Sequence, residues 1–145
     1  MCNFKSMILL KDRVYCPDYD MHGKMLNDLH IRDDQLRPSF VKVEITPPER
    51  DPFAKIENWK YSVDQDYLPE WYVEEIDKKR ALAALAEWAA KRIFVDVKGL
   101  VLSDGEGYCL KRCSGVKLTG NAYVTIIDSS SIDVARDSSS VGKMC

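Results

Sequence analysis

The feature that most constrains the fold is a repeat in the last third of the sequence. Short polar segments rich in Gly, Asn, Asp and Ser recur between residues 115 and 141, each followed by aliphatic residues at alternating positions. A unit this short cannot bury its apolar side alone, so successive units must stack on one another. The repeat therefore predicts a short β-solenoid over residues 105–145. Its expected inward-facing residues are Leu110, Val116, Val124, Ile132 and Val141.

Residues 1–104 have the pattern of an α+β domain. Strict alternation of apolar and polar residues predicts strands, and apolar residues three and four positions apart predict helices. The expected elements are a hairpin at 7–16, a helix at 21–29, strands at 41–46 and 59–64, a helix at 70–94 and a strand at 95–102. The predicted fold class is a small antiparallel sheet with two helices, followed by the short solenoid.

Two details of the helices follow from local chemistry. Asp20 precedes the first helix, where a short carboxylate side chain commonly caps exposed backbone N–H groups. In the second helix, apolar residues at helical spacing predict one buried stripe. The expected stripe is Leu82, Leu85, Ala86, Ala89 and Ile93.

The charge balance disfavours several classes of partner. Lys and Arg number 21 and Asp and Glu number 23, for a formal net charge of -2. This balance gives no attraction for a phosphate backbone, so nucleic acid is an unlikely partner. The sequence contains neither an apolar run of the ~20 residues that span a bilayer nor the start of a secretory signal. We therefore expect a cytoplasmic protein that does not bind membranes.

The five cysteines are odd in number and scattered, which is typical of reduced thiols in the cytoplasm. Cys109 and Cys113 have the spacing of half a zinc site, but no second pair follows them. We therefore expect no metal and no cofactor. Cys2 is the candidate nucleophile, because removal of Met1 would leave its thiol beside a terminal amine that can act as base. His22 is the alternative base. The alternative interpretation is that Cys2 simply begins the first strand.

A second group of candidate residues lies between the last predicted strand of the α+β domain and the long helix. Asp64 and Asp66, with Glu44 on the neighbouring strand, could gather around a divalent cation. Acidic residues at this point are also common helix caps, and we favour that structural role. Aromatic residues here suit a binding surface or a core. The predicted binding residues are Asp64, Asp66, Tyr67, Trp71 and Tyr72.

Three segments carry a family resemblance. Residues 1–6, 40–48 and 59–71, read together with the Gly-Asn-Ala and Asp-Ser-Ser repeats, resemble a group of uncharacterised bacterial and bacteriophage proteins. The resemblance covers most of the chain and implies an N-terminal α+β domain, a repeat tail and a phage or prophage origin. Because that family carries no assigned activity, it implies no catalytic residues.

The leading functional hypothesis is a phage- or prophage-encoded protein-interaction module in the host cytoplasm, since solenoids present extended recognition surfaces. Its partner would be a host or phage protein, for example one belonging to a host defence system. A solenoid end could also pair with a second copy of the chain. This hypothesis favours a chain that is not an enzyme. One alternative is an amide or thioester hydrolase that uses Cys2, and a second is a small-molecule binding protein, such as a nucleotide binder.

Overall fold

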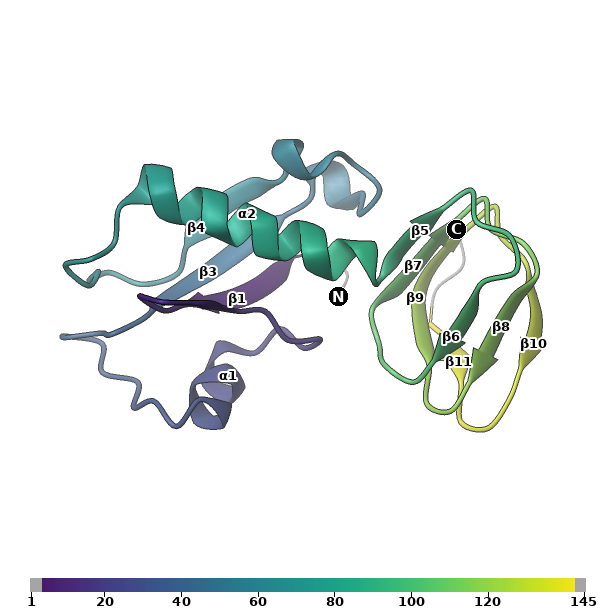
Figure 1. Ribbon diagram of the computed structural model, residues 1–145, viewed down its shortest axis with the longest axis horizontal. Coiled ribbons are helices and arrows are strands. Elements are labelled where there is room, and N and C mark those ends of the chain that lie inside the picture. Colours follow the sequence, from purple (N-terminus) through teal and green to yellow (C-terminus); the bar gives the residue numbers. More distant parts are fainter. Residues whose placement is uncertain (1–3, 143–145) are drawn as a thin grey trace. The chain divides into compact units, whose positions relative to one another are not determined.

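The computed structural model describes residues 4–142, which form two compact units, one ending at Trp88 and the other beginning at Ala89. The first unit contains a four-stranded sheet and two α-helices, and the second is a β-solenoid of about three turns (Figure 1). The predicted fold class is therefore confirmed. None of the helices within residues 4–142 combines the length and apolar character needed to cross a membrane.

The sheet of the first unit is antiparallel throughout. Its strands are β1 (Lys5–Leu9), β2 (Val14–Tyr15), β3 (Val41–Thr46) and β4 (Lys60–Val63). They lie in the order β2-β1-β3-β4, so the predicted hairpin and the predicted pairing of the two alternating strands are both confirmed. Two short 3-10 helices, Pro48–Arg50 and Ile56–Asn58, lie in the connection between β3 and β4.

Strand side chains alternate between the two faces of this sheet, and each face has buried residues. On one face, Ile8 of β1 packs against Met25 and Leu26 of the helix α1 (His22–Asp28). On the other face, Met7 and its cross-strand neighbour Val43 are fully buried. Figure 1 shows the long helix α2 lying across β1, β3 and β4. The apolar–polar alternation of β3 therefore corresponds to residues that are in turn buried and half-buried, whereas the apolar run of β1 is buried on both faces.

The long helix α2 (Glu74–Ala90) is shorter than expected and turned about its axis relative to the predicted stripe. Leu82 is only half-buried and Ala86 is exposed, so the expected stripe is wrong at these positions. The buried side chains of the helix are Asp77, Ala81, Leu85, Trp88 and Ala89. Burial of the large Trp88 ring, three positions after Leu85, accounts for the rotation, since aromatic side chains dominate the apolar area of a core.

Asp20 does not cap α1, in contrast to the expectation. The residue before the helix is Met21, and no side chain caps its first turn. The Asp20 carboxylate instead accepts hydrogen bonds from Lys5 Nζ at 2.8 Å and from the Ser6 backbone N–H at 3.0 Å. The Lys5 side chain is completely buried, and an unpaired buried charge is strongly destabilising. Pairing Asp20 with Lys5 therefore stabilises the fold more than a cap on this short helix would.

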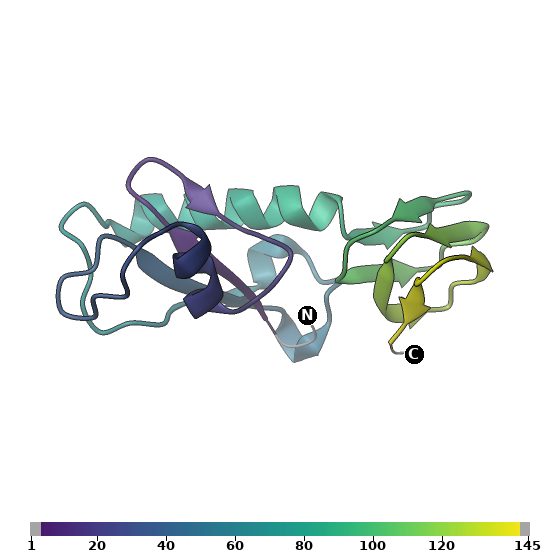
Figure 2. The same cartoon turned by 90° about the horizontal axis from the view of Figure 1, so that it is seen from below.

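The second unit winds two parallel ladders around one core, and Figure 2 shows its strands stacked on one another. One ladder has the order β11-β9-β7-β5 and the other β10-β8-β6. The strands are β5 (Ile93–Val95), β6 (Val101–Ser103), β7 (Tyr108–Lys111), β8 (Val116–Thr119), β9 (Tyr123–Asp128), β10 (Ile132–Ala135) and β11 (Ser140–Val141).

The solenoid begins earlier than the expected boundary between residues 104 and 105. Ile93 of β5 already pairs in parallel with Cys109 of β7, so β5 and β6 belong to the first turn. These strands have three residues each and no Gly-Asn-Ala or Asp-Ser-Ser signature, which is why the repeat in the sequence starts later. The predicted inward positions Leu110, Val116 and Val124 are fully buried.

The remaining two inward positions lie in the last strands. Ile132 is half-buried and packs against the solenoid core. Val141 pairs with Val124 on the preceding turn but is 37% exposed. The predicted inward direction therefore fits the register at both positions, while burial falls along the last described turn.

Polar side chains at the corners join one turn to the next. The backbone N–H of Cys113 donates to Ser130 Oγ at 2.8 Å, and that of Gly120 donates to Asp137 Oδ2 at 3.1 Å. At another corner, Arg112 makes a two-point ion pair with Asp96, 16 residues earlier. The Asp and Ser rows of the repeat therefore satisfy backbone donors at tight bends, as short polar side chains commonly do.

Candidate functional site

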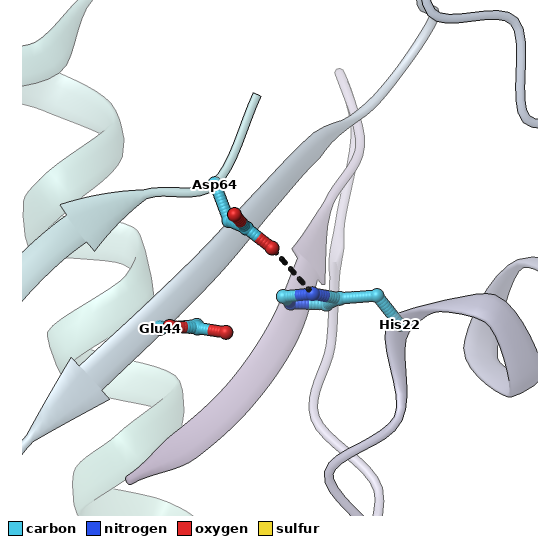
Figure 3. A group of neighbouring side chains, drawn as sticks. All are labelled: His22, Glu44 and Asp64. Carbon is cyan, nitrogen blue, oxygen red and sulfur yellow. Dashed lines mark ion pairs between the residues drawn. The ribbon is translucent and has the colours of Figure 1, made fainter. Parts of the chain in front are cut away.

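One histidine and two carboxylates from three separate elements meet in the first unit (Figure 3). His22 is the first residue of α1, Glu44 lies in β3, and Asp64 directly follows β4. One possible ligand atom from each residue lies within 4.8 Å of those of the other two. Among the residues that the structure describes, this is the group of histidine and acidic side chains that could hold a metal ion.

The backbone places these three side chains by ordinary strand and helix geometry. Glu44 points away from the buried Val43 because successive strand side chains alternate. The Asp64 backbone N–H donates to the Lys42 carbonyl at 2.8 Å, which extends the β3–β4 pairing by one residue. His22 joins them because α1 packs on the same face of the sheet. The sequence pattern thus brings Glu44 and Asp64 together, and the tertiary packing adds the histidine.

The two nitrogens of the His22 ring have different neighbours. Nε2 lies 3.0 Å from the backbone carbonyl oxygen of Val43, and Nδ1 lies 3.5 Å from Asp64 Oδ2. A carbonyl oxygen can only accept, so Nε2 carries a proton and donates to Val43. Nδ1 then either carries a second proton or presents a lone pair to the carboxylate. The His22 side chain is 10% exposed and that of Asp64 60%.

Beside this cluster the surface is hollowed by a cavity of about 640 Å³. Three of the predicted binding residues, Asp64, Asp66 and Tyr67, line it. Gln65 holds the loop that carries them, because its amide accepts from the Lys42 N–H at 2.6 Å and donates to the carbonyl oxygens of Phe40 and Tyr67. The cavity wall is Asp33, Gln35, Leu36, Pro38, Phe40, Lys42, Val63, Asp64, Gln65, Asp66 and Tyr67.

The other two predicted binding residues lie elsewhere. Trp71 lines a smaller hollow of about 310 Å³ with Lys11, Val73, Ile76, Asp77 and Arg80. Tyr72 contacts the Trp71 ring edge-on and shares a hydrogen bond of 2.8 Å with the Tyr61 hydroxyl. Burial raises the pKa of Tyr61 and of Tyr72, so both hydroxyls stay neutral near pH 7. The predicted aromatic cluster is therefore divided between two hollows and a half-buried hydroxyl pair.

The candidate nucleophile Cys2 lies outside the described residues, and its proposed base His22 is engaged with Val43 and Asp64. Burial raises the pKa of the Cys16 thiol to about 11, partly offset by Lys5, so Cys16 is a thiol and not a reactive thiolate near pH 7. Cys109 and Cys113 are buried in the solenoid. Their sulfur atoms contact backbone carbonyl oxygens of Gly107 and Phe94.

Gln65 was not predicted as a site residue, and His22 was predicted as a base for Cys2, not as a neighbour of Glu44 and Asp64. Gln65 lies between two predicted site residues, and a polar residue between paired carboxylates is the signal that could have suggested its bridging role. His22 has no neighbour in the sequence that indicates a partner, because it meets Glu44 and Asp64 only through packing. No family model, curated protein or solved structure matches this chain.

Proposed function

We propose that this chain is a phage- or prophage-encoded protein-interaction module whose partner is a host or phage protein. The resemblance of residues 1–6, 40–48 and 59–71 to bacterial and bacteriophage proteins supports the origin. The observation that carries the interaction is an exposed apolar patch at the start of α2, made of Trp71, Val73 and Ile76. An uncovered apolar patch with a polar rim is typical of a protein-binding surface.

The patch combines exposure with a fixed polar rim. Val73 is 48% exposed and Ile76 is 61% exposed, although both adjoin the half-buried Trp71 ring. The guanidinium of Arg80 is held at one side by Asp77 Oδ1 at 2.6 Å and by the Arg13 carbonyl oxygen at 3.1 Å. Tryptophan and arginine are both enriched among the residues that contribute most to binding in protein interfaces.

The rim also indicates the chemistry of the partner. Arg80 is already neutralised by Asp77, whereas Lys11 at the edge of the hollow is exposed. A partner segment would match this surface if it inserted an aliphatic or aromatic side chain into the apolar patch beside Trp71. It would also place a carboxylate near the positive charge of Lys11. We therefore assign the patch to a protein segment that carries an apolar anchor next to an acidic residue.

A matched pair of charge substitutions tests this function. The full chain is purified from phage-infected host cells, its partner is identified, and the purified partner is titrated by calorimetry. Ile76→Glu should weaken the affinity for the partner by ~10-fold or more, because it places a carboxylate in the apolar patch. Val101→Glu is the control, since Val101 is exposed to a similar extent, 58% against 61%, but lies on the solenoid.

Two results would contradict the proposal. One is a complex that Ile76→Glu leaves intact. The other is a self-association that Ile76→Glu abolishes, because the patch would then bind a second copy of the chain and not a host or phage protein.

A second candidate function is the binding of a small molecule in the cavity beside Asp64, Asp66 and Tyr67. The observation that favours it is the convergence of three predicted binding residues on one hollow of about 640 Å³, a size common for ligand pockets. Three Asp residues line the cavity, and its one Lys, Lys42, is paired with Asp33 at 2.9 Å. This acidic wall favours a cationic or hydroxyl-rich ligand over a free nucleotide.

Mass spectrometry of the protein before and after denaturation tests this second function. A ligand released in a stoichiometric amount should disappear from a Tyr67→Ala variant, which removes an exposed aromatic ring from the cavity wall. Tyr123→Ala, which removes an exposed ring from the solenoid, should still carry it. A protein that carries no ligand, or a ligand that both variants retain, would contradict binding in this cavity.

A further inference from the structure

We propose that His22, Glu44 and Asp64 form a binding site for a divalent transition-metal cation such as Zn²⁺ or Mn²⁺. Imidazole and carboxylate are the ligands that these ions accept together, whereas Mg²⁺ and Ca²⁺ favour oxygen ligands alone. Three protein ligands with further positions open to solvent are typical of reactive metal centres. Asp64, which is 60% exposed, supplies the open side of this site.

The orientation of His22 is the first observation that supports the site. Its Nε2 donates to the Val43 carbonyl oxygen at 3.0 Å, and this bond directs Nδ1 towards the two carboxylates. Metal-binding histidines usually donate their second ring N–H to a backbone carbonyl or a carboxylate, which fixes the ring and its tautomer. The imidazole is nine-tenths buried, so it is held in this orientation by packing as well.

The electrostatics of the cluster also favour a positive charge between the three side chains. A neutral His22 ring would turn the Nδ1 lone pair towards Asp64 Oδ2, 3.5 Å away, and two acceptors repel one another. Lys42, on the same face of the strand as Glu44, pairs with Asp33 instead. Within residues 4–142, Glu44 has no ion-pair partner. A cation bound between the three side chains would neutralise both carboxylates at once.

A buried hydroxyl beside the cluster is an independent second observation. Ser6 is directly opposite Glu44 in the β1–β3 register, so the two side chains lie on the same face. The Ser6 side chain is fully buried, and its Oγ has no hydrogen-bond partner among the described residues. Buried hydroxyls are almost always hydrogen-bonded. A cation with its bound water next to Glu44 would supply the missing partner.

One separation in the cluster, between His22 and Asp64, already fits a shared ion. Ligand atoms ~2.1 Å from a common ion can lie at most ~4.2 Å apart, and His22 Nδ1 and Asp64 Oδ2 meet this limit at 3.5 Å. The three ligand atoms are all within 4.8 Å of one another. Rotation of the flexible Glu44 side chain, which has no ion-pair partner among the described residues, would bring its carboxylate within this limit.

Calorimetric titration of the reduced, chelator-treated protein with Zn²⁺ tests the site. We expect one ion per chain at this site, and His22→Gln, Glu44→Gln and Asp64→Asn should each weaken binding by at least ~10-fold. Glu57→Gln and His30→Gln are the matched controls, because they remove an exposed carboxylate outside the cluster and the other histidine of the chain. Both controls should bind Zn²⁺ like the unmodified protein.

Because cysteine thiolates also bind Zn²⁺, a second measurement uses Mn²⁺, which prefers oxygen and nitrogen ligands. Substoichiometric Mn²⁺ should broaden the NMR amide signals of His22, Glu44 and Asp64 before all others. Circular dichroism of each variant checks that it is folded. Zn²⁺ binding unchanged in the His22→Gln and Asp64→Asn variants would overturn the proposal, as would Mn²⁺ broadening centred elsewhere. Saturation of neither ion at millimolar concentration would also overturn it and would leave His22 and Asp64 as a proton-mediated ion pair.

Discussion

Asp104 accepts a hydrogen bond on its Oδ1 from the backbone N–H of Asn121, 17 residues further along the chain and 2.8 Å away. This bond fastens one corner of the solenoid to the next. The same oxygen occupies the space that a Cβ atom on Gly120 would need, and Gly120 itself has a φ of +60°. The corner therefore depends on glycine for both its conformation and its close approach to a carboxylate.

Replacing Gly120 with Ala should destabilise the solenoid. The substitution places a Cβ against Asp104 and imposes a left-handed conformation on alanine, and we expect a loss of ~1–3 kcal/mol in the free energy of unfolding. Denaturant unfolding and amide hydrogen exchange of residues 93–135 measure this loss. Gly23→Ala is the control, since nothing lies within 4 Å of a Cβ at this helical position. That change should stabilise α1 by ~0.5–1 kcal/mol, and equal effects at the two glycines would contradict the argument.

The parts of the fold that the sequence predicts well are those with local periodicity. The alternation from Val41 to Thr46 identifies a strand, and the corner residues around Gly120 identify the solenoid. The repeat does not predict the first solenoid turn, because β5 and β6 are stabilised by pairing with β7 and β8. Such pairing between distant segments leaves no local pattern in the sequence. The buried stripe of α2 was misplaced because the position of Trp88 depends on the sheet beneath it.

The candidate site likewise has a part that local periodicity predicts and a part that depends on tertiary packing. Glu44 and Asp64 are neighbours because their strands pair, and alternation is enough to place them on one face. The position of His22 depends on the packing of Met25 and Leu26 against Ile8, a contact between distant parts of the chain. Predicting the cluster from sequence therefore needs the docking of α1, which no local pattern encodes.

The Cys16 thiol should react slowly with iodoacetamide in the folded protein. Burial raises its pKa from 9.0 to about 11, so the rate of alkylation should rise with pH up to about pH 11, as the thiolate forms. Urea should accelerate the reaction at pH 8, because it exposes the thiol and removes the burial that raises its pKa. The folded state keeps the proton between pH 9 and 11 while the unfolded state releases it. The contribution of the protonated Cys16 thiol to the free energy of unfolding is therefore fully present below pH 9 and is lost as the pH rises towards 11.

Mass-spectrometric mapping of the alkylated peptides separates Cys16 from the other cysteines, and a Cys16→Ser variant supplies the stability control. The pH-dependent loss of stability between 9 and 11 should be smaller in that variant. Rapid labelling of Cys16 at pH 8 in the folded protein would show that the thiol is not shielded.

Removing the buried charge of Lys5 should be strongly destabilising. Lys5 Nζ donates to Asp20 Oδ1 at 2.8 Å and to the Tyr19 carbonyl oxygen at 3.0 Å. Lys5→Met leaves Asp20 without its cation, and we expect a loss of ~3–5 kcal/mol in the free energy of unfolding. Urea denaturation measures the loss. The double substitution Lys5→Met, Asp20→Asn should recover part of it, because no uncompensated charge remains.

Lys24→Met provides the exposed counterpart of this test. Lys24 pairs with Asp28 at 3.9 Å on the surface of α1, and its side chain is 51% exposed. Removing this pair should change stability by less than ~1 kcal/mol. An equal loss in the free energy of unfolding for Lys5→Met and Lys24→Met would contradict the argument that burial makes the Lys5–Asp20 ion pair strong.

Replacing Ser6 with Ala separates two roles of the hydroxyl opposite Glu44. In chelator-treated protein, the substitution deletes a buried Oγ that has no partner among the described residues, so it should be neutral or stabilise the fold by up to ~1 kcal/mol. With saturating Zn²⁺ the sign should reverse, because the hydroxyl then accepts or donates a hydrogen bond beside the bound ion. Thermal unfolding with and without Zn²⁺ measures both values. Destabilisation of the same size under the two conditions would show that Ser6 is bonded within the protein itself and that its hydroxyl reports nothing about a cation.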